Sequence, residues 1–436
     1  MEATDRTMES AIAGRNALKQ RIQERLLGRL DFSAMSLLDP IMLRAQLAML
    51  VMQILEEDGA AFSNADREEV INDVMNEILG LGPLEPLLKD EEVSDILVNT
   101  AARIYVERSG RLSLSPKRFR DNQHLRDVID KIVARVGRRI DESSPMVDAR
   151  LEDGSRVNAI IPPLALDGPI LSIRKFCRER LQLEHLVTRG ALTPEIGEML
   201  KAMVYGRLNI LIAGGTGCGK TTMLNLLSGF IPAEERIITI EDAAELQLRQ
   251  EHVVRLETRP SNVEGKGEIS QRDLVRNSLR MRPDRIVLGE VRGPEALDML
   301  QAMNTGHDGS LATIHANSAR DAVTRIETMV AMAGLNLPIH MLRHYVASAL
   351  DVIVHLSRLS DGTRKLMSVQ EVVGMEQDVI VLQEIFRFEQ TGLDESRRVR
   401  GRFIAAGVRP HFMARLDAFG IAVPPDLFDP KRIREV

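Results

Sequence analysis

Residues 214 to 221 show the clearest chemical signature in the chain. The run Gly214-Gly-Thr-Gly-Cys-Gly-Lys220-Thr221 follows the apolar segment from Leu208 to Ala213 and precedes a helix-like stretch. This is the strand, loop and helix context that a phosphate-binding loop requires. Glycines let backbone N–H groups approach phosphate oxygens, and the N-terminus of the following helix favours negative charge. The alternative, a glycine-rich turn with an incidental lysine, does not account for the flanking pattern.

We therefore predict a nucleoside triphosphate site. Lys220 is expected to reach the β- and γ-phosphates, and the Thr221 hydroxyl is expected to hold Mg²⁺. The predicted nucleotide-binding residues are Gly214, Gly215, Thr216, Gly217, Cys218, Gly219, Lys220, Thr221 and Thr222.

Two further strand-like runs end in carboxylates. Residues 236–240 lead into Glu241-Asp242, and residues 285–288 lead into Gly289-Glu290. Carboxylates at the carboxyl ends of parallel strands beside a phosphate loop reach Mg²⁺ or orient a water, although a turn or helix cap is the alternative. The second run lacks the Asp of a general Walker B strand, so Mg²⁺ is expected to depend on Thr221, on water and less directly on Glu290. Either glutamate is a candidate general base, with a slight preference for Glu290.

Histidines flank a third strand-like run, residues 310–316, at His307 and His315. We expect them to sense the γ-phosphate, with a structural role for each as the alternative. They are not expected to bind a metal, because no cysteine or carboxylate cluster at ligand spacing accompanies them.

Several arginines lie between the two acidic strand ends. A solvated helix face explains most of them, but in a ring of subunits one or two would reach the γ-phosphate of a neighbour. The set is Arg255, Arg259, Arg272, Arg276, Arg280, Arg282 and Arg285.

Composition limits the classes of function. The 57 Lys and Arg residues against 63 Asp and Glu give a net charge of -6, so no global basic field attracts nucleic acid. The absence of Trp, with three Tyr and eleven Phe, leaves few platforms for stacking bases. Only Cys177 and Cys218 occur, which predicts a reducing, cytosolic compartment. The most apolar stretch, Leu47 to Leu55, is too short to span a bilayer, so membrane contact is expected only through partners.

The chain of 436 residues is long enough for two or three domains. Residues 1–80 have helical periodicity and are interpreted as a helical bundle, either an inert appendage or a docking module for a partner. Residues 81–180 have the short alternating runs of an α+β domain. Residues 181–192 are interpreted as a linker, and residues 193–436 as a parallel α/β domain with a C-terminal extension. Arg156 and Arg174 lie on strands of the α+β domain, where a solvated face and a phosphate contact are the two interpretations.

Four motifs in this order resemble those of bacterial secretion and pilus traffic ATPases. They are the phosphate loop, the acidic box at residues 238–246, the Asp-less Walker B run at residues 286–295 and the histidine box at residues 305–317. The runs at residues 148–158, 173–176 and 255–260, with the tail at residues 371–388, resemble the CpaF branch, the motor of tight-adherence (Tad, type IVc) pili. The resemblance covers residues 80 to 420.

The resemblance implies a homohexamer in which a PAS-like α+β domain and a RecA-like P-loop ATPase domain enclose ATP. It implies hydrolysis of ATP to ADP and phosphate with Mg²⁺, coupled to movement of Tad platform proteins in the inner membrane. The enzyme would then be cytoplasmic and peripheral at that membrane. On this basis Arg156 and Arg174 reach the nucleotide, Glu241 and Glu290 are the glutamates of the catalytic site, and Arg255 and Arg259 are candidate contacts in trans.

Two other functions remain open at this point. A motor for conjugation or type II secretion has the same motifs, although the C-terminal tail favours the Tad system. A nucleic-acid translocase would share the RecA-like core, but net acidity and scarce aromatic residues argue against it. A GTPase is disfavoured because no Asn-Lys-x-Asp motif follows the loop.

Overall fold

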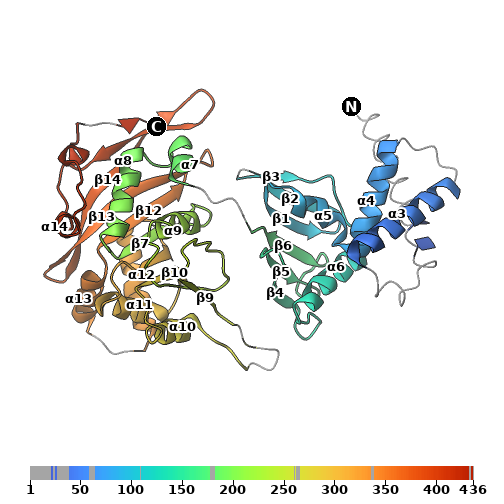
Figure 1. Ribbon diagram of the computed structural model, residues 1–436, viewed down its shortest axis with the longest axis horizontal. Coiled ribbons are helices and arrows are strands. Elements are labelled where there is room, and N and C mark those ends of the chain that lie inside the picture. Colours follow the sequence, from blue (N-terminus) through green and yellow to red (C-terminus); the bar gives the residue numbers. More distant parts are fainter. Residues whose placement is uncertain are drawn as a thin grey trace. The chain divides into compact units, whose positions relative to one another are not determined.

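The computed structural model describes residues 21–22, 25–26, 39–57, 64–108, 110–176, 182–259, 261, 266–334, 338–431 and 434–435. The chain forms two compact units, Met1–Cys177 and Arg178–Val436 (Figure 1). The helical bundle predicted for residues 1–80 is therefore described only in part, and Cys177 lies outside the described residues. No helix in the described ranges is long and apolar enough to cross a membrane.

Helices α3 (Pro40–Glu57) and α4 (Asn64–Leu79) begin the first unit and pack through Leu47, Val51, Val70 and Val74. The Asp39 carboxylate accepts a hydrogen bond of 2.8 Å from the backbone N–H of Ile41, as expected of an Asp-Pro start. The opposite face of α3 exposes four large apolar side chains, those of Ile41, Met42, Met49 and Met52.

These helices belong to the same compact unit as the α+β domain. The ammonium group of Lys131 donates to the carbonyl of Gly80 at 2.6 Å, and Lys117 pairs with Asp73 at 3.4 Å. Because these bonds cross the predicted boundary at residue 80, that boundary lies inside one packed body.

The α+β domain is an antiparallel sheet in the order β3-β2-β1-β6-β5-β4. Strands β1, β2, β5 and β6 alternate buried residues with more exposed ones, so one face of the sheet supplies a core with helix α6. Asp121 caps α6 by accepting from the N–H of His124 at 2.8 Å. This is a PAS-like domain, and its elements are η1 (Gly82–Leu84), α5 (Glu85–Lys89), β1 (Val93–Thr100), β2 (Arg103–Arg108), β3 (Arg111–Leu114), α6 (Asn122–Arg135), β4 (Met146–Arg150), β5 (Arg156–Ile160) and β6 (Ile170–Arg174).

The second unit is built on one long sheet in the order β16-β15-β14-β13-β12-β7-β11-β10-β8-β9. Its central strands are parallel, and β7 (Ile210–Gly214) is buried along its whole length. Ile210 and Ile212 face one apolar core, whereas Leu211 and Ala213 face another. Because both faces of a parallel sheet are covered, a strand in its centre has a continuous apolar sequence. The apolar runs therefore predicted a parallel α/β domain correctly.

The remaining elements of the parallel region are α7 (Leu183–Thr188), α8 (Pro194–Tyr205), α9 (Lys220–Ser228), β8 (Ile237–Glu241), β9 (Val253–Glu257), α10 (Gln271–Ser278), β10 (Arg285–Val291), α11 (Glu295–Asn304), β11 (Leu311–His315), α12 (Ala319–Met332), α13 (Ile339–Ala349) and β12 (Val352–Arg358). The prediction that residues 181–192 are a linker is wrong for α7. Leu186 is buried in a core of the second unit, and Leu183 packs so closely on Gly197 that a Cβ there would lie 2.4 Å from it.

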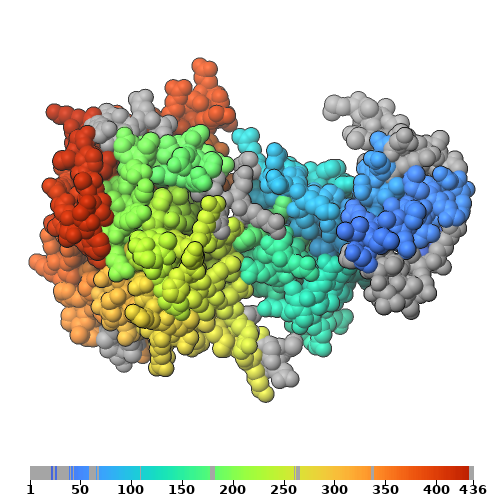
Figure 2. Space-filling model, in the orientation of Figure 1, coloured from blue at the N-terminus to red at the C-terminus, as the bar shows by residue number. Residues whose placement is uncertain are grey.

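The C-terminal extension continues the sheet with antiparallel strands, which the parallel interpretation did not anticipate. They are β13 (Arg364–Glu376), β14 (Val379–Leu393), β15 (Val399–Ala405) and β16 (Arg434–Glu435), accompanied by α14 (Met413–Ala418) and η2 (Pro425–Phe428). The exposed tip between β14 and β15 projects from the surface of the unit (Figure 2).

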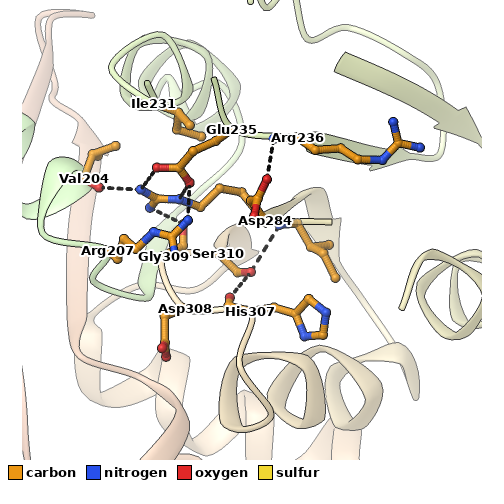
Figure 3. Close-up of polar contacts among 12 residues, drawn as sticks. Val204, Arg207, Ile231, Glu235, Arg236, Asp284, His307, Asp308, Gly309 and Ser310 are labelled. Atoms are coloured by element: carbon orange, nitrogen blue, oxygen red, sulfur yellow. Dashed lines mark hydrogen bonds and ion pairs between the residues drawn. The ribbon is translucent and has the colours of Figure 1, made fainter. Parts of the chain in front are cut away.

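A buried ion pair between Arg285 and Glu235 lies at the amino-terminal ends of the parallel strands (Figure 3). The Arg285 side chain is fully buried and donates to both carboxylate oxygens of Glu235, at 2.6 and 3.1 Å. It also donates to the carbonyls of Gly309 and Val204, both at 3.0 Å. Arg207 completes the cluster with a 2.9 Å bond to Glu235. Arg285 was grouped with solvated arginines in the sequence, and this assignment is wrong.

We expect Arg285→Met to lower the free energy of unfolding by about 3–5 kcal/mol, because it leaves the Glu235 carboxylate buried with only one partner. Arg207→Met is the matched control, since the Arg207 side chain is 33% exposed and a partly exposed pair stabilises by about 0–1 kcal/mol. Urea unfolding at neutral pH, followed by circular dichroism, measures both values. Equal losses in the two variants would contradict a special role for Arg285.

The same cluster predicts a dependence on pH. Burial alone would raise the pKa of Glu235, but hydrogen bonds from Arg285 and Arg207 lower it overall. A lowered carboxyl pKa stabilises the fold above the ordinary glutamate range and is lost as pH falls through the lowered value. The stability difference between the parent and Arg285→Met should therefore shrink in acid.

Candidate nucleotide site

The predicted phosphate loop joins β7 to α9 at the carboxyl edge of the parallel strands. Gly217 and Gly219 have φ values of +70° and +100°, a region that favours glycine. Gly214 is required for space, because a Cβ there would lie 2.4 Å from the Cys218 sulfur and 2.7 Å from the carbonyl oxygen of Leu356. Burial raises the pKa of the Cys218 thiol, which disfavours the thiolate form.

Lys220 begins helix α9 and folds back over the loop. Its ammonium group donates to the carbonyls of Gly214 and Gly215, each at 3.0 Å, and lies 3.9 Å from a carboxylate oxygen of Glu290. The lysine is therefore held at the mouth of the loop, next to one of the predicted glutamates.

Glu241 ends β8 and is almost completely buried. One of its oxygens accepts from the N–H groups of Glu245 and Leu246, at 2.7 and 2.9 Å. The other oxygen is buried and has no hydrogen-bond partner within the described part of the chain. Burial raises the pKa of Glu241, outweighing the two backbone hydrogen bonds and the nearby Arg255, which lower it. The carboxylate thus keeps one acceptor open for a group that the protein does not supply.

Gly289 explains the missing Walker B aspartate. Strands β8 and β10 pair in parallel, with Ile240 opposite Leu288, so Glu241 and Gly289 follow as neighbours. A Cβ on Gly289 would lie only 3.0 Å from the Cγ of Glu241. The Glu241 side chain therefore occupies the space beside β10 that a larger residue at position 289 would need.

Glu290 is held by cations on two sides. One of its oxygens accepts from Arg292 at 2.9 and 2.5 Å, and the other faces Lys220. Arg292 also reaches the Asp242 carboxylate at 3.2 Å, so it bridges the carboxyl ends of β10 and β8. Arg292 was not among the predicted site residues, and the only signal for it was its position two residues after Glu290.

The two histidines do not share a site. His315 ends β11 directly beside Gly214 in the pairing of β11 with β7. His307 lies before β11, at the opposite edge of the sheet, where its carbonyl accepts from the Ser310 hydroxyl at 2.8 Å (Figure 3). The prediction that His307 senses the γ-phosphate bound to its own loop is wrong, because the length of a strand separates it from that loop.

Four other arginines were predicted to contact nucleotide, and they lie on strands or close to them. Arg255 lies exposed on β9, the edge strand of the long sheet, and Arg259 follows it and donates to the carbonyl of Gly267 at 2.6 Å. In the first unit, Arg156 and Arg174 are direct partners in the pairing of β5 with β6, and Arg174 contacts Asp95 at 3.4 Å.

Thr221 lies in the first turn of α9, after Lys220. In the described ranges, no group of three or more His, Cys, Asp and Glu side chains could hold a metal by itself. Magnesium usually takes one or two carboxylates together with substrate phosphates, and Thr221 with Glu290 supplies a hydroxyl and a carboxylate of that kind beside the loop.

Comparison with known proteins identifies the family of the chain. The model of the type II/IV secretion system protein family matches residues 77–406, and the model of the N-terminal domain of type II secretion system protein E matches residues 16–79. A Mycobacterium tuberculosis protein named for conjugal transfer is 39% identical over 302 residues, which are 68% of this chain and 85% of that protein. The conjugal transfer protein TrbB of Rhizobium radiobacter is 31% identical over 293 residues, 66% of this chain and 85% of TrbB.

Among solved structures, the VirB11 ATPase of the Brucella suis type IV secretion system is 30% identical. The match covers 66% of this chain and 95% of VirB11, with a TM-score of 0.37. The family model spans far more than half of the residues. The chain therefore belongs to the type II/IV secretion system protein family and is one of its secretion-system traffic ATPases.

Proposed function

We propose that this ATPase is a hexameric motor that powers assembly of a Tad (type IVc) pilus, peripheral at the inner membrane through its platform proteins. The observation that carries the catalytic part is the convergence of Lys220, Glu241 and Glu290 at one edge of the sheet. The pilus part is supported by the resemblance of the C-terminal tail, which forms β13 and β14.

The loop residues bind the triphosphate. Backbone N–H groups of the loop and of the first turn of α9 surround the phosphates, as in other phosphate loops. Lys220 exchanges the carbonyls of Gly214 and Gly215 for phosphate oxygens. His315 lies beside the loop on the next strand and contacts the γ-phosphate. Thr221 and Glu290 would hold a bound Mg²⁺, which would neutralise phosphate charge.

Glu241 is the better candidate for the general base. It has a buried oxygen with no hydrogen-bond partner within the described residues, and burial raises its pKa, both of which favour accepting a proton from the attacking water. Glu290 forms ion pairs with Arg292 and Lys220. It is therefore better suited to positioning the lysine and the metal than to accepting a proton. This reverses the slight preference for Glu290 drawn from the sequence.

Arginines outside the loop complete the proposed site. Arg156 and Arg174 are direct partners in the pairing of β5 with β6. We propose, on the resemblance to the family, that both contact a nucleotide phosphate. Arg255 or Arg259, near the edge strand β9, would reach the nucleotide of the neighbouring subunit in the ring.

Conjugation is the second candidate function, and the names of the relatives in M. tuberculosis and R. radiobacter favour it. In either case the enzyme would hydrolyse ATP and pull or turn a membrane partner. The two candidates differ in that partner.

We expect Lys220→Ala to abolish ATP hydrolysis while the circular dichroism spectrum and the thermal midpoint stay close to the parent values. Among the described residues, the ammonium group contacts the loop carbonyls and Glu290, so its loss removes phosphate binding without opening the core. Normal hydrolysis by this variant would overturn the site.

The pH dependence of hydrolysis distinguishes the two glutamates. Because burial raises the pKa of Glu241, the turnover rate should fall with decreasing pH at values above the ordinary glutamate range. Glu241→Gln should keep ATP binding and lose turnover almost completely, together with this acidic limb. Glu290→Gln is the matched control and should keep the limb but need a different Mg²⁺ concentration. Equal losses and identical profiles would refute the assignment.

The choice of partner is testable by stimulation of the ATPase. A Tad platform protein in detergent should raise the rate for the full chain, whereas DNA should not, given the net charge of -6. Stimulation by DNA with a steep salt dependence would favour a translocase. Stimulation only by a conjugation membrane protein would favour the second candidate.

A further inference from the structure

Strand β10 contains a β-bulge at Gly289 and Glu290. Both residues lie opposite one residue of β11, Thr313, because the pairing of the two strands slips by one position there. The pairs that flank the bulge are Leu288 with Ala312 and Val291 with Ile314. Bulges re-aim side chains and are common beside active sites, so this one bears on the direction of Glu290.

The bulge determines on which face of the sheet Glu290 emerges. Side chains of a regular strand alternate between the two faces, so a residue two positions after Leu288 would point into the same apolar core as Leu288. Instead Val291 shares that core with Leu288, although an odd number of positions separates them. The extra residue thus places Val291 in the core and directs Glu290 toward the phosphate loop, where its carboxylate lies 3.9 Å from the Lys220 ammonium group.

Two buried side chains bond the carbonyls of the bulge. A bulge interrupts the ladder of backbone hydrogen bonds, so its polar groups need other partners. The Thr313 hydroxyl donates to the carbonyl of Gly289 at 2.6 Å, and the Gln271 amide donates to the carbonyl of Glu290 at 2.9 Å. Thr313 and Gln271 are only 1% and 7% exposed. Loss of either donor would therefore remove an interior hydrogen bond from the bulge.

The residues after the bulge are also held in place. The buried Glu295 carboxylate accepts from the N–H groups of Arg292 and Gly293, at 2.7 and 2.8 Å. Arg292 in turn pairs with the Glu290 carboxylate. These contacts fix the chain on the carboxyl side of Glu290, and Thr313 supplies the contact from the neighbouring strand.

We propose that Thr313 is a positioning residue whose hydroxyl holds the bulge at Gly289, so that the bulge aims Glu290 at Lys220. Gln271 holds the second carbonyl of the bulge in the same way. This inference rests on the proposed function, because it names the residue that sets the place of Glu290 within the same site. Since Thr313 acts through Glu290, its effect on hydrolysis depends on the Glu290 carboxylate.

The test compares Thr313→Val and Thr313→Ser in the full chain. Valine has nearly the shape of threonine without the hydroxyl, and serine keeps the hydroxyl. The matched control is Thr239→Val on β8, the other neighbour of β10. Thr239 is also 1% exposed, but its hydroxyl has no hydrogen-bond partner within the described part of the chain.

Two kinds of measurement are needed. Steady-state assays give kcat and the Mg²⁺ concentration at half-maximal rate. Hydrogen exchange, followed by mass spectrometry on peptides that cover residues 285–292, monitors the bulge in the absence of metal and nucleotide. Thermal melting checks that each variant is folded.

Thr313→Val should lower kcat roughly tenfold, because the Gly289 carbonyl loses its donor and the bulge no longer fixes Glu290. It should change the Mg²⁺ requirement in the same direction as Glu290→Gln and accelerate exchange in the bulge peptides. Thr313→Ser should bring kcat back to within about threefold of the parent value. Thr239→Val should match the parent in every assay.

A double variant tests the route through Glu290. In the Glu290→Gln background, Thr313→Val should lower kcat by less than about a further twofold, because the carboxylate that the bulge positions is already absent. A further loss as large as that in the parent background would contradict the proposal.

Parent-like kcat or unchanged hydrogen exchange in Thr313→Val would overturn the proposal, and so would a serine variant as slow as the valine variant. Equal losses in Thr313→Val and Thr239→Val would assign the effect to repacking of the sheet and would also contradict it. In each of these cases Lys220→Ala would still be inactive if the proposed function holds. If the parent did not hydrolyse ATP, the proposed function itself would fail.

Discussion

The parallel pairing of β7 with its two neighbours is the constraint on which the nucleotide site depends. Gly214 is opposite His315 in β11 and opposite Leu356 in β12, so both flanking strands end beside the same loop. The pairing also makes Gly214 irreplaceable, because the carbonyl of Leu356 and the sulfur of Cys218 fill the space of a Cβ. Residues from distant parts of the chain meet at the loop because their strands end at the same level.

The two edges of this sheet have different tasks. At the amino-terminal edge, charged groups pair completely: Arg285 uses its donors on Glu235 and on the carbonyls of Gly309 and Val204. Such a network fixes the positions of neighbouring strands along their axes. It therefore also fixes where these strands end at the carboxyl edge. At the carboxyl edge, Glu241 has a buried oxygen without a hydrogen-bond partner among the described residues, and Lys220 lies 3.9 Å from Glu290. The first edge stabilises the fold, and the second is arranged for a ligand.

The sequence predicted those parts of the site that local pattern determines. The phosphate loop, Lys220 and the strand-end position of Glu241 follow from short motifs next to apolar runs. His307 was misplaced because a motif shows two histidines near one strand without showing that they lie at its opposite ends. Arg285 looked solvated because its partner, Glu235, is 50 residues away. The role of Gly289 depends on the pairing of β8 with β10, which no local pattern in a single sequence reveals.

The buried Glu241 carboxylate is itself informative about the ligand. One of its oxygens has no hydrogen-bond partner within the described residues, and a buried polar atom in that state costs free energy. The Lys220 ammonium group contacts the carbonyls of Gly214 and Gly215, and it would have to exchange them for phosphate oxygens when a nucleotide binds. Binding would therefore favour the conformation in which these groups are aligned on the phosphates. In the proposed motor, this coupling would transmit the state of the nucleotide to the strands that end at the loop.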